Sequence, residues 1–230
     1  MHRIAIDPAV LERVRAKRGT SGNPPELVAA GTALLVIDLQ NIFLLPGMPC
    51  EVPIAREIIP NVNRLATAVR DAGGIVVWVQ MVADPDPSGW SVYHAMRDQT
   101  TQAAITTMMQ PGHAAQALHA ELQVEPRDLI VEKRRYSAFI QGSSDLDARL
   151  RALGIDTVVV AGTLTNVCCE STARDAMMLN YRVVFVSDAN AARDDATHNA
   201  TLGNILSTFG EVLTTDEVVG LLHEEEPTED

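Results

Sequence analysis

Residues 157–181, TVVVAGTLTNVCCESTARDAMMLNY, change from the periodicity of a strand to that of a helix. The run Thr157–Ala161 consists of small and branched apolar residues, which is typical of a buried strand. A polar segment follows it, and apolar residues then recur at helical spacing over Cys169–Leu179. A strand followed by a loop and a helix is the repeating unit of α/β proteins.

The same alternation extends in both directions along the chain. Besides Thr157–Ala161, the predicted strands are Thr32–Asp38, Ile75–Gln80, Asp128–Glu132, Arg182–Val186 and Glu211–Leu213. Besides Cys169–Leu179, the predicted helices are Asn61–Ala72, Leu146–Leu153, Ala192–Phe209 and a last helix that begins near Asp216. Nearly continuous apolar strands separated by helices predict a parallel sheet covered on both faces. We therefore expect an α/β fold with three α-β-α layers around a Rossmann-like, six-stranded parallel sheet.

The composition argues against several kinds of partner. A net charge of −12 disfavours nucleic-acid binding, because phosphate contacts need clustered lysine and arginine. No apolar run reaches the roughly 18 residues that span a bilayer, and the first residues lack the apolar stretch of a secretory signal. We therefore expect a cytoplasmic protein that binds neither nucleic acid nor membrane.

The length of 230 residues and the hydrophobic content of 47% suit one large α/β domain, which we place at residues 31–222. Residues 1–30 are locally basic and predict an N-terminal arm or helix. Residues 223–230 are rich in carboxylates and predict a solvated acidic tail. The less regular stretch Met81–Pro111 predicts a lid or a contact between subunits.

Three predicted strands end in residues that can carry chemistry. The first strand ends at Asp38, Lys133 follows the third, and the fourth leads through a short segment to Cys168. Because the carboxyl ends of parallel strands share one edge, where ligands bind, we expect an acid, a base and a thiol to meet there. The pattern alone leaves other roles open, since Asp38 could cap a turn and Lys133 could pair with a neighbouring carboxylate.

Cys168 lies near the start of a predicted helix, where free N–H groups and the helix dipole favour an anion. We expect these groups and Lys133 to lower the pKa of the thiol, and the N–H groups to form an oxyanion hole. A buried structural thiol is the alternative. Cys169 is turned about 100° around the helix and should face the core, and Cys50 lies in a proline-rich loop with no assigned role.

Three segments of the chain match one known family. VIDLQNIF at 36–43 resembles the D-x-Q-N-x-F strand end of the isochorismatase-like cysteine hydrolases. EKRRYSAF at 132–139 resembles their K-x-x-Y-S-A-F segment, and residues 161–181 are similar to their G-x-x-T-N-x-C-V-E-S-T-A-R-D-A signature. The segments follow the family's order and spacing, and the similarity runs from about residue 32 to about residue 218.

The resemblance implies a catalytic triad of Asp38, Lys133 and Cys168. It also implies a cis peptide bond between Thr163 and Leu164, and an oxyanion hole formed by the N–H groups of Leu164 and Cys168. Family members form homodimers or homotetramers, so we expect one of these states. The family usually has valine directly after the nucleophile, where this chain has Cys169. A thiol in place of an isopropyl group is a mild change, which supports a structural role for Cys169.

These residues together predict a cysteine-dependent amidohydrolase that works through a thioester and needs no cofactor. Nicotinamidases of the family hold a metal with histidines shortly after the first motif, but this chain has no histidine between His2 and His94. A metal of that type is therefore not expected. An isochorismatase cleaves a vinyl ether and does not need the cysteine, so the presence of Cys168 argues against that activity. The alternative from another class of function is a binding protein or a redox-sensing thiol without hydrolytic activity.

The substrate is expected to be a small ureide, carbamoyl compound or carboxamide. PRDLIVEKRRYSAF at 126–139, TNVCCEST at 165–172 and DDATH at 194–198 resemble the ureidoacrylate amidohydrolases of the family most. Asn41, Phe43, Trp90 and Tyr136 are the predicted substrate-binding residues. For Phe43 and Trp90, core packing or a subunit contact is an equal alternative.

Overall fold

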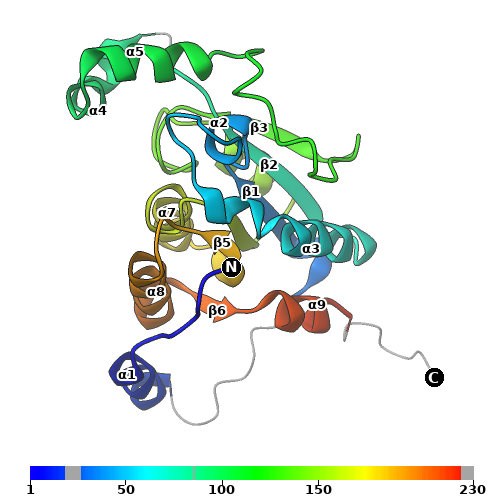
Figure 1. The fold of residues 1–230 in the computed structure, drawn as a ribbon. Helices are drawn as coiled ribbons and strands as arrows, with labels where there is room; N and C mark the ends of the chain where they lie inside the picture. The colour runs from blue at the N-terminus through cyan, green and yellow to red at the C-terminus, as the bar shows by residue number, and fades with distance from the viewer. Residues whose placement is uncertain (19–26, 85, 224–230) are drawn as a thin grey trace.

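A six-stranded, all-parallel sheet forms the centre of the molecule (Figure 1). The computed structural model describes residues 1–18, 27–84 and 86–223. The spatial order of the strands is β3-β2-β1-β4-β5-β6, so the chain starts in the middle, builds one half of the sheet and then the other. The strands are β1 (Thr32–Ile37), β2 (Ile75–Met81), β3 (Leu129–Lys133), β4 (Thr157–Thr163), β5 (Arg182–Ala191) and β6 (Glu211–Leu213).

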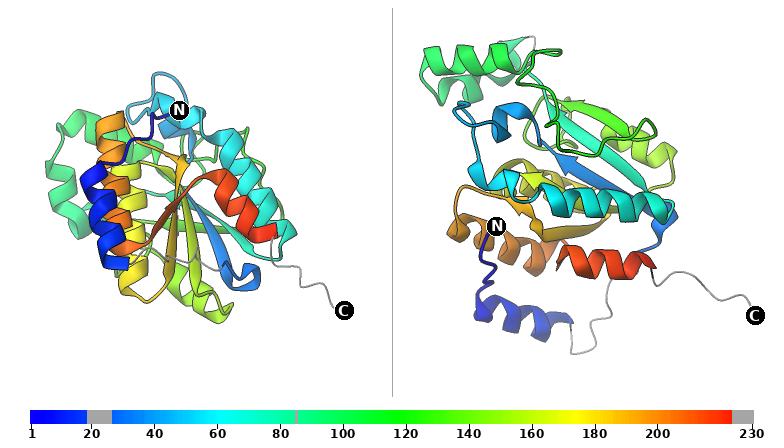
Figure 2. Two further views of the ribbon diagram at one scale, coloured as in Figure 1. Left: turned by 90° about the horizontal axis from the view of Figure 1, so that it is seen from below. Right: turned by 45° about the vertical axis from the view of Figure 1, so that its right-hand side comes forward.

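Helices cover both faces of the sheet, as the alternating sequence pattern predicted (Figure 2). On one face lie α3 and α9, and on the other lie α6, α7 and α8, with α1 outside α8. The α-helices are α1 (Pro8–Arg18), α2 (Asn41–Leu44), α3 (Ile59–Asp71), α4 (Ser91–Ala95), α5 (Gln99–Met108), α6 (Leu146–Ala152), α7 (Glu170–Met178), α8 (Asp195–Asn204) and α9 (Thr215–His223). The predicted three-layer α/β fold is confirmed.

The central strand β1 explains why the sheet needs a layer on each side. Its residues from Ala33 to Ile37 are completely buried. Leu34 and Val36 belong to the core under α3 and α9, whereas Leu35 and Ile37 belong to the core under α6, α7 and α8. Successive side chains of a strand point to opposite faces, so a strand that is apolar throughout is stable only between two layers.

Strand β4 is two residues longer than predicted, because Gly162 continues it. The φ angle of Gly162 is 125°, and a Cβ atom there would lie 2.1 Å from the carbonyl oxygen of Ile37 on β1. Only glycine allows β4 to stay paired with β1 at this point. The predicted strand stops at Ala161, but Gly162 extends it and brings Thr163 to the carboxyl edge of the sheet.

The helices beside this edge also begin differently from the prediction. Cys168 lies in a π-helical turn, η4 (Thr165–Cys169), which precedes α7. The predicted helix Ala192–Phe209 is α8 followed by a second π-helical segment, η5 (Ile205–Phe209). Helix α8 begins only at Asp195, because the side chain of Asp194 accepts a hydrogen bond from the N–H of Thr197 and so caps its first turn.

The stretch predicted as a lid or subunit contact projects from the sheet as η3 (Pro87–Trp90), α4 and α5 (Figure 1). The predicted arm contains α1, while residues 19–26 and the acidic residues 224–230 lie outside the described residues. No helix within the described part of the chain is long and apolar enough to cross a membrane. The predicted homodimer or homotetramer stays a prediction.

Candidate active site

A buried ion pair lies at the carboxyl edge of the sheet. Asp38 follows β1 and Lys133 is the last residue of β3, so strand β2 separates them in the sheet. The Nζ atom of Lys133 lies 2.8 Å from Oδ2 of Asp38, and both side chains are fully buried. The ammonium group also donates a hydrogen bond to the carbonyl oxygen of Arg135. The backbone of Asp38 has a positive φ of 55°, which turns the chain at the end of the strand.

The thiol of Cys168 completes this cluster. Cys168 comes from η4, after strand β4, and is 7% exposed. Its sulfur lies close enough to Asp38 and Lys133 for both charges to act on the pKa of the thiol. The structure thus brings together the three residues that the sequence placed at the ends of three strands. Cys169 points into the core under α7 and is fully buried, as its position one residue further predicted.

The electrostatics of the cluster are set mainly by burial. Burial raises the pKa of Asp38, although the charge of Lys133 opposes the shift. Burial and the charge of Asp38 raise the pKa of the Cys168 thiol, and Lys133 offsets this only in part. The sequence-based expectation of a lowered thiol pKa is therefore wrong. The thiol keeps its proton at neutral pH, and Asp38 is a stronger base than an exposed aspartate.

The segment that leads to Cys168 is held on both sides. The peptide bond between Thr163 and Leu164 is cis. The hydroxyl of Thr163 donates to the carbonyl oxygen of Ala191 at 3.1 Å, and the hydroxyl of Thr165 lies 2.9 Å from Nδ1 of His198. Since β5 and α8 supply both partners, the position of the segment depends on the half of the sheet that follows β4.

A cavity of about 180 Å³ opens in front of the thiol. Its walls combine aromatic rings, thioethers and two arginines, so it is apolar with a few fixed charges. The lining residues are Phe43, Cys50, Met81, Tyr93, Arg97, Met109, Tyr136, Leu164, Val167, Cys168 and Arg193. A concave, mostly apolar pocket with a few polar groups and a perturbed titratable residue is the usual form of a small-molecule site.

Comparison with known proteins agrees with this geometry. The sequence model of the isochorismatase domain matches residues 32–217. The chain belongs to the isochorismatase family. It is 34% identical to the ureidoacrylate amidohydrolase RutB of Variovorax paradoxus over 211 residues, which cover 85% of this chain and 83% of that protein.

Solved structures of the isochorismatase family have the same fold. A cysteine hydrolase from Pseudomonas syringae superposes with a TM-score of 0.80 at 29% identity, over 88% of this chain and 99% of that one. The N-carbamoylsarcosine amidase from Thermoplasma acidophilum superposes with a TM-score of 0.65 at 29% identity, over 80% of this chain and 96% of that one. The family fold therefore extends over most of this chain.

Two of the four predicted substrate-binding residues line the cavity of this isochorismatase-family protein, namely Phe43 and Tyr136. Asn41 does not, because its side chain donates to the carbonyl oxygen of Ala114 and fixes a neighbouring loop. Trp90 also lies outside the lining. Its ring stacks on Tyr93 at 4.2 Å and meets Tyr136 edge-on at 4.9 Å, so it supports the aromatic wall from behind.

The cavity wall also contains three residues that the sequence pattern did not indicate, namely Tyr93, Arg97 and Arg193. Tyr93 and Arg97 come from α4 and the turn after it, which the sequence identified only as an irregular stretch. Arg193 lies between β5 and α8, directly before the DDATH segment that carried part of the family resemblance. With a net charge of −12, the composition gave no sign that two arginines would meet in one cavity.

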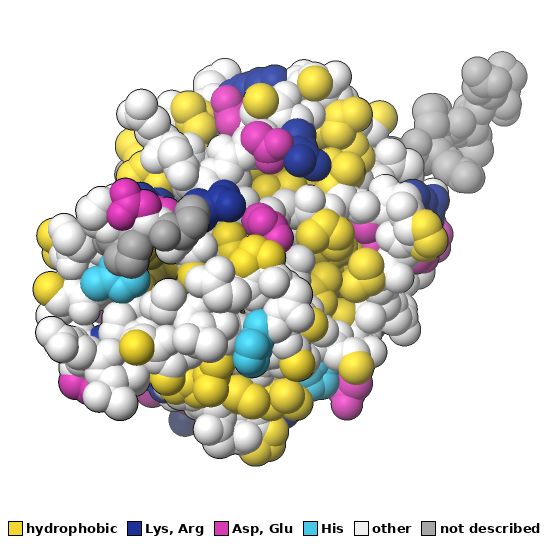
Figure 3. All heavy atoms as spheres, turned by 90° about the horizontal axis from the view of Figure 1, so that it is seen from above, with side chains coloured by type: hydrophobic (Ala, Val, Ile, Leu, Met, Phe, Trp, Pro, Cys, Tyr) yellow, Lys and Arg dark blue, Asp and Glu magenta, His cyan; other side chains and the backbone are white. Residues whose placement is uncertain are grey.

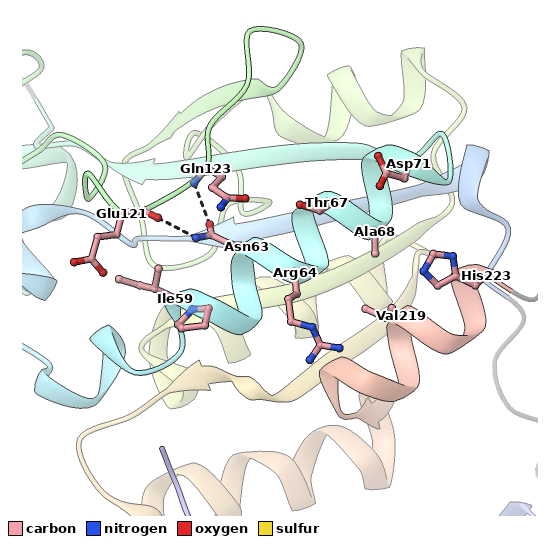
Figure 4. Close-up of a pocket in the computed structure, with 11 residues that line it drawn as sticks. Ile59, Asn63, Arg64, Thr67, Ala68, Asp71, Glu121, Gln123, Val219 and His223 are labelled. Atoms are coloured by element: carbon pink, nitrogen blue, oxygen red, sulfur yellow. Dashed lines mark hydrogen bonds between the residues drawn. The ribbon is translucent and has the colours of Figure 1, made fainter.

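A larger groove of about 580 Å³ lies away from this cluster, between α3, α9 and the 121–123 loop (Figure 4). Asn63 donates to the carbonyl oxygen of Glu121 and accepts from the N–H of Gln123, so it ties the loop to α3. The groove does not reach Asp38, Lys133 or Cys168.

Within the ranges that the structure describes, no group of three or more His, Cys, Asp or Glu side chains is arranged to hold a metal ion. On the face in Figure 3, basic and acidic side chains lie among hydrophobic ones and do not gather into one basic patch.

Proposed function

We propose that this member of the isochorismatase family is a cysteine-dependent amidohydrolase that cleaves a non-peptide C–N bond of a small ureido or carbamoyl compound. The observation that carries the proposal is the buried pair of Asp38 and Lys133, 2.8 Å apart, in contact with a thiol that faces a cavity. The similarity to a ureidoacrylate amidohydrolase and to an N-carbamoylsarcosine amidase supports the same type of bond.

The first half of the reaction forms a thioester. Asp38 accepts the thiol proton while the sulfur of Cys168 attacks the carbonyl carbon, so that no free thiolate has to accumulate. The N–H groups of Leu164 and Cys168 are our candidates for the donors that stabilise the oxyanion of the tetrahedral intermediate. The protonated Asp38 then gives its proton to the departing nitrogen. Ammonia or an amine leaves, and the acyl group stays on the sulfur.

The second half returns the enzyme to its starting state. Asp38, again a carboxylate, accepts a proton from water, and the resulting hydroxide attacks the thioester. The tetrahedral intermediate collapses, the C–S bond breaks, and the thiol regains the proton from Asp38. Lys133 keeps its positive charge throughout. Its role is to stabilise the carboxylate form of a fully buried aspartate, which would otherwise be protonated and unable to act as a base.

Two arginines in the cavity point to substrates that carry a carboxylate. Among the described residues, no carboxylate forms an ion pair with Arg97 or Arg193. The guanidinium carbon of Arg97 lies 4.9 Å from the centroid of the Tyr93 ring, and Arg193 donates a hydrogen bond to the carbonyl oxygen of Glu51. The pair Asp38–Lys133 is neutral as a whole, so both guanidinium charges remain for a ligand. Arginine binds carboxylates strongly because its planar group can donate two parallel hydrogen bonds. We therefore favour ureido acids.

Ammonia release from a panel of ureido acids, N-carbamoyl amino acids and plain carboxamides tests the proposal. Each acid is paired with its methyl ester, which has the same scissile bond but no negative charge. We expect turnover of at least one ureido acid, with its ester at least about tenfold poorer in kcat/KM. Cys168→Ser should abolish turnover and Cys169→Ala should retain it. Full turnover by Cys168→Ser, or a panel without any substrate, would reject the proposal.

A further inference from the structure

The first residues of the chain run along α8 (Figure 2). His2 reaches Ala192, the residue before Arg193, which lines the cavity. Asn199 of α8 accepts a hydrogen bond from the N–H of Ala5 at 2.6 Å and donates to the carbonyl oxygen of Arg3 at 2.9 Å. Further along, Ile6 packs against the core and the side chain of Val10 lies over Gly203. The arm is therefore docked on α8 at several points.

The side chain of His2 has a hydrogen-bond partner at each of its two ring nitrogens. Its side chain is 1% exposed, although the neighbouring residues are largely exposed. Nδ1 lies 2.8 Å from Oδ1 of Asp195, and Nε2 accepts a hydrogen bond of 2.9 Å from the N–H of Ala192. Because Nε2 is an acceptor, the proton of the neutral ring is on Nδ1 and is donated to Asp195. Ala192 directly precedes Arg193, which lines the cavity.

A second contact makes the ring of His2 rigid. It stacks on the ring of His198 with the centroids 4.2 Å apart and the planes at 16°. His198 is fully buried, with Nε2 3.0 Å from the carbonyl oxygen of Ser187 and Nδ1 2.9 Å from the hydroxyl of Thr165. The carbonyl can only accept, so Nε2 carries the proton and Nδ1 accepts from Thr165. His2 thus rests on a ring that is itself fixed from two sides.

We propose that His2 is a positioning residue for substrate binding: by accepting the N–H of Ala192, it fixes the backbone from which Arg193 projects into the cavity. The buried Nε2 atom of His2 can accept this hydrogen bond in only one geometry, so it restricts the backbone of Ala192 more than a water molecule in its place would. His2 itself does not line the cavity, so it acts through Arg193 and not on the substrate. The inference rests on the proposed function only in that Arg193 is taken to bind a carboxylate.

The arm offers a matched control. Arg3 is the next residue, its side chain is exposed, and its two hydrogen bonds, to Asp195 and Asn199, are made by its backbone. Arg3→Ala should therefore leave the docking of the arm intact. His2→Gln is the conservative variant, because a side-chain amide can accept from Ala192 and donate to Asp195. His2→Ala removes both bonds and the stacked ring.

Alkylation of the Cys168 thiol tests the inference without any substrate. Iodoacetamide is neutral and iodoacetate carries a carboxylate, so the ratio of their second-order rates reports how well the arginines of the cavity attract an anion. The rates are measured in a Cys50→Ala, Cys169→Ala background, because Cys50 also lines the cavity. We expect His2→Ala to slow iodoacetate about fivefold relative to iodoacetamide, His2→Gln to recover most of the loss, and Arg3→Ala to match the parent. With a hydrolysed ureido acid, His2→Ala should raise KM about fivefold and change kcat by less than about twofold.

Two results would overturn the inference: an unchanged ratio in His2→Ala, whether both reagents keep their rates or slow equally, or the same change of the ratio in Arg3→Ala. Equal slowing would mean that the arm only stabilises the fold. If the wild-type protein hydrolyses no ureido acid, the proposed function fails, yet the alkylation ratio still decides whether His2 positions Arg193. Circular dichroism and the melting temperature of each variant show whether the comparison is made between folded proteins.

Discussion

Removal of the Lys133 charge should disable the base and shift the pH dependence of the reaction. Its Nζ atom lies 2.8 Å from Asp38 Oδ2, with both groups fully buried. At an effective dielectric constant of about 20, two unit charges at this separation attract by about 6 kcal/mol. This attraction lowers the pKa of Asp38 by at most about four units, and it opposes burial, which raises that pKa.

The variant to measure is Lys133→Met, which keeps the apolar length of the side chain. The pKa of Asp38 should rise further, so activity requires a higher pH and kcat/KM at neutral pH should fall at least about a hundredfold. The acid limb of the kcat/KM profile should move upward by two units or more. Stability in urea should fall by about 3 kcal/mol or more, because one buried charge is left without its partner.

The double variant Lys133→Met, Asp38→Asn separates the two effects. It removes both charges and should regain most of the stability in urea, while the hydrolytic activity should be lost at every pH because no base remains. If Lys133→Met kept the wild-type rate and the wild-type acid limb, our assignment of Lys133 as the residue that holds Asp38 ionised would be refuted.

Three further predictions concern the cavity, the buried histidine and the strand glycine. Arg193→Met should raise KM for a ureido acid about tenfold to a hundredfold and leave KM for its methyl ester unchanged, in steady-state assays of both compounds. His198 has a pKa lowered to about 4 by burial and by the nearby His2, so its neutral form contributes stability that is present above pH 6.5 and lost as the pH falls toward 4. Urea unfolding of the wild type should therefore lose up to about 3 kcal/mol more than His198→Gln over this range, and equal losses would contradict the assignment. Gly162→Ala should destabilise the protein by at least about 3 kcal/mol in the same assay, since its Cβ atom would lie 2.1 Å from the carbonyl oxygen of Ile37.

The residues that meet at the sheet edge could be predicted because strand periodicity determines where each strand ends. Once Asp38, Lys133 and the segment before Cys168 are assigned to the ends of parallel strands, the sheet leaves them only one edge to share. The order of the strands does not have to be known for this. A few errors of one or two residues at the strand ends did not change the result.

The sign of the thiol pKa could not be predicted in the same way. A helix terminus and a lysine both lower a thiol pKa, and both are visible in the sequence. The degree of burial and the closeness of Asp38 are not visible, and these two effects decide the direction at Cys168. Local pattern alone thus overestimated the ionised fraction of the Cys168 thiol.

The walls of the cavity were the least predictable part. Trp90 and Tyr93 are three residues apart, and which of them faces the cavity depends on how η3 and α4 are oriented, which periodicity over so short a stretch does not define. Arg193 follows Ala192, whose N–H donates to His2, and no local signal indicates this contact between residues 190 positions apart. Contacts of this kind follow from tertiary packing.

The mass of the protein during turnover tests the central claim most directly. In a Cys169→Ala background, the reaction with a slowly hydrolysed ureido acid is quenched in acid and intact protein is weighed. We predict a transient increase equal to the acyl part of the substrate, located on Cys168, that disappears as the substrate is consumed and is absent in Cys168→Ala. Turnover at the wild-type rate without any such increase, or in the Cys168→Ala variant, would contradict a thioester mechanism at this residue.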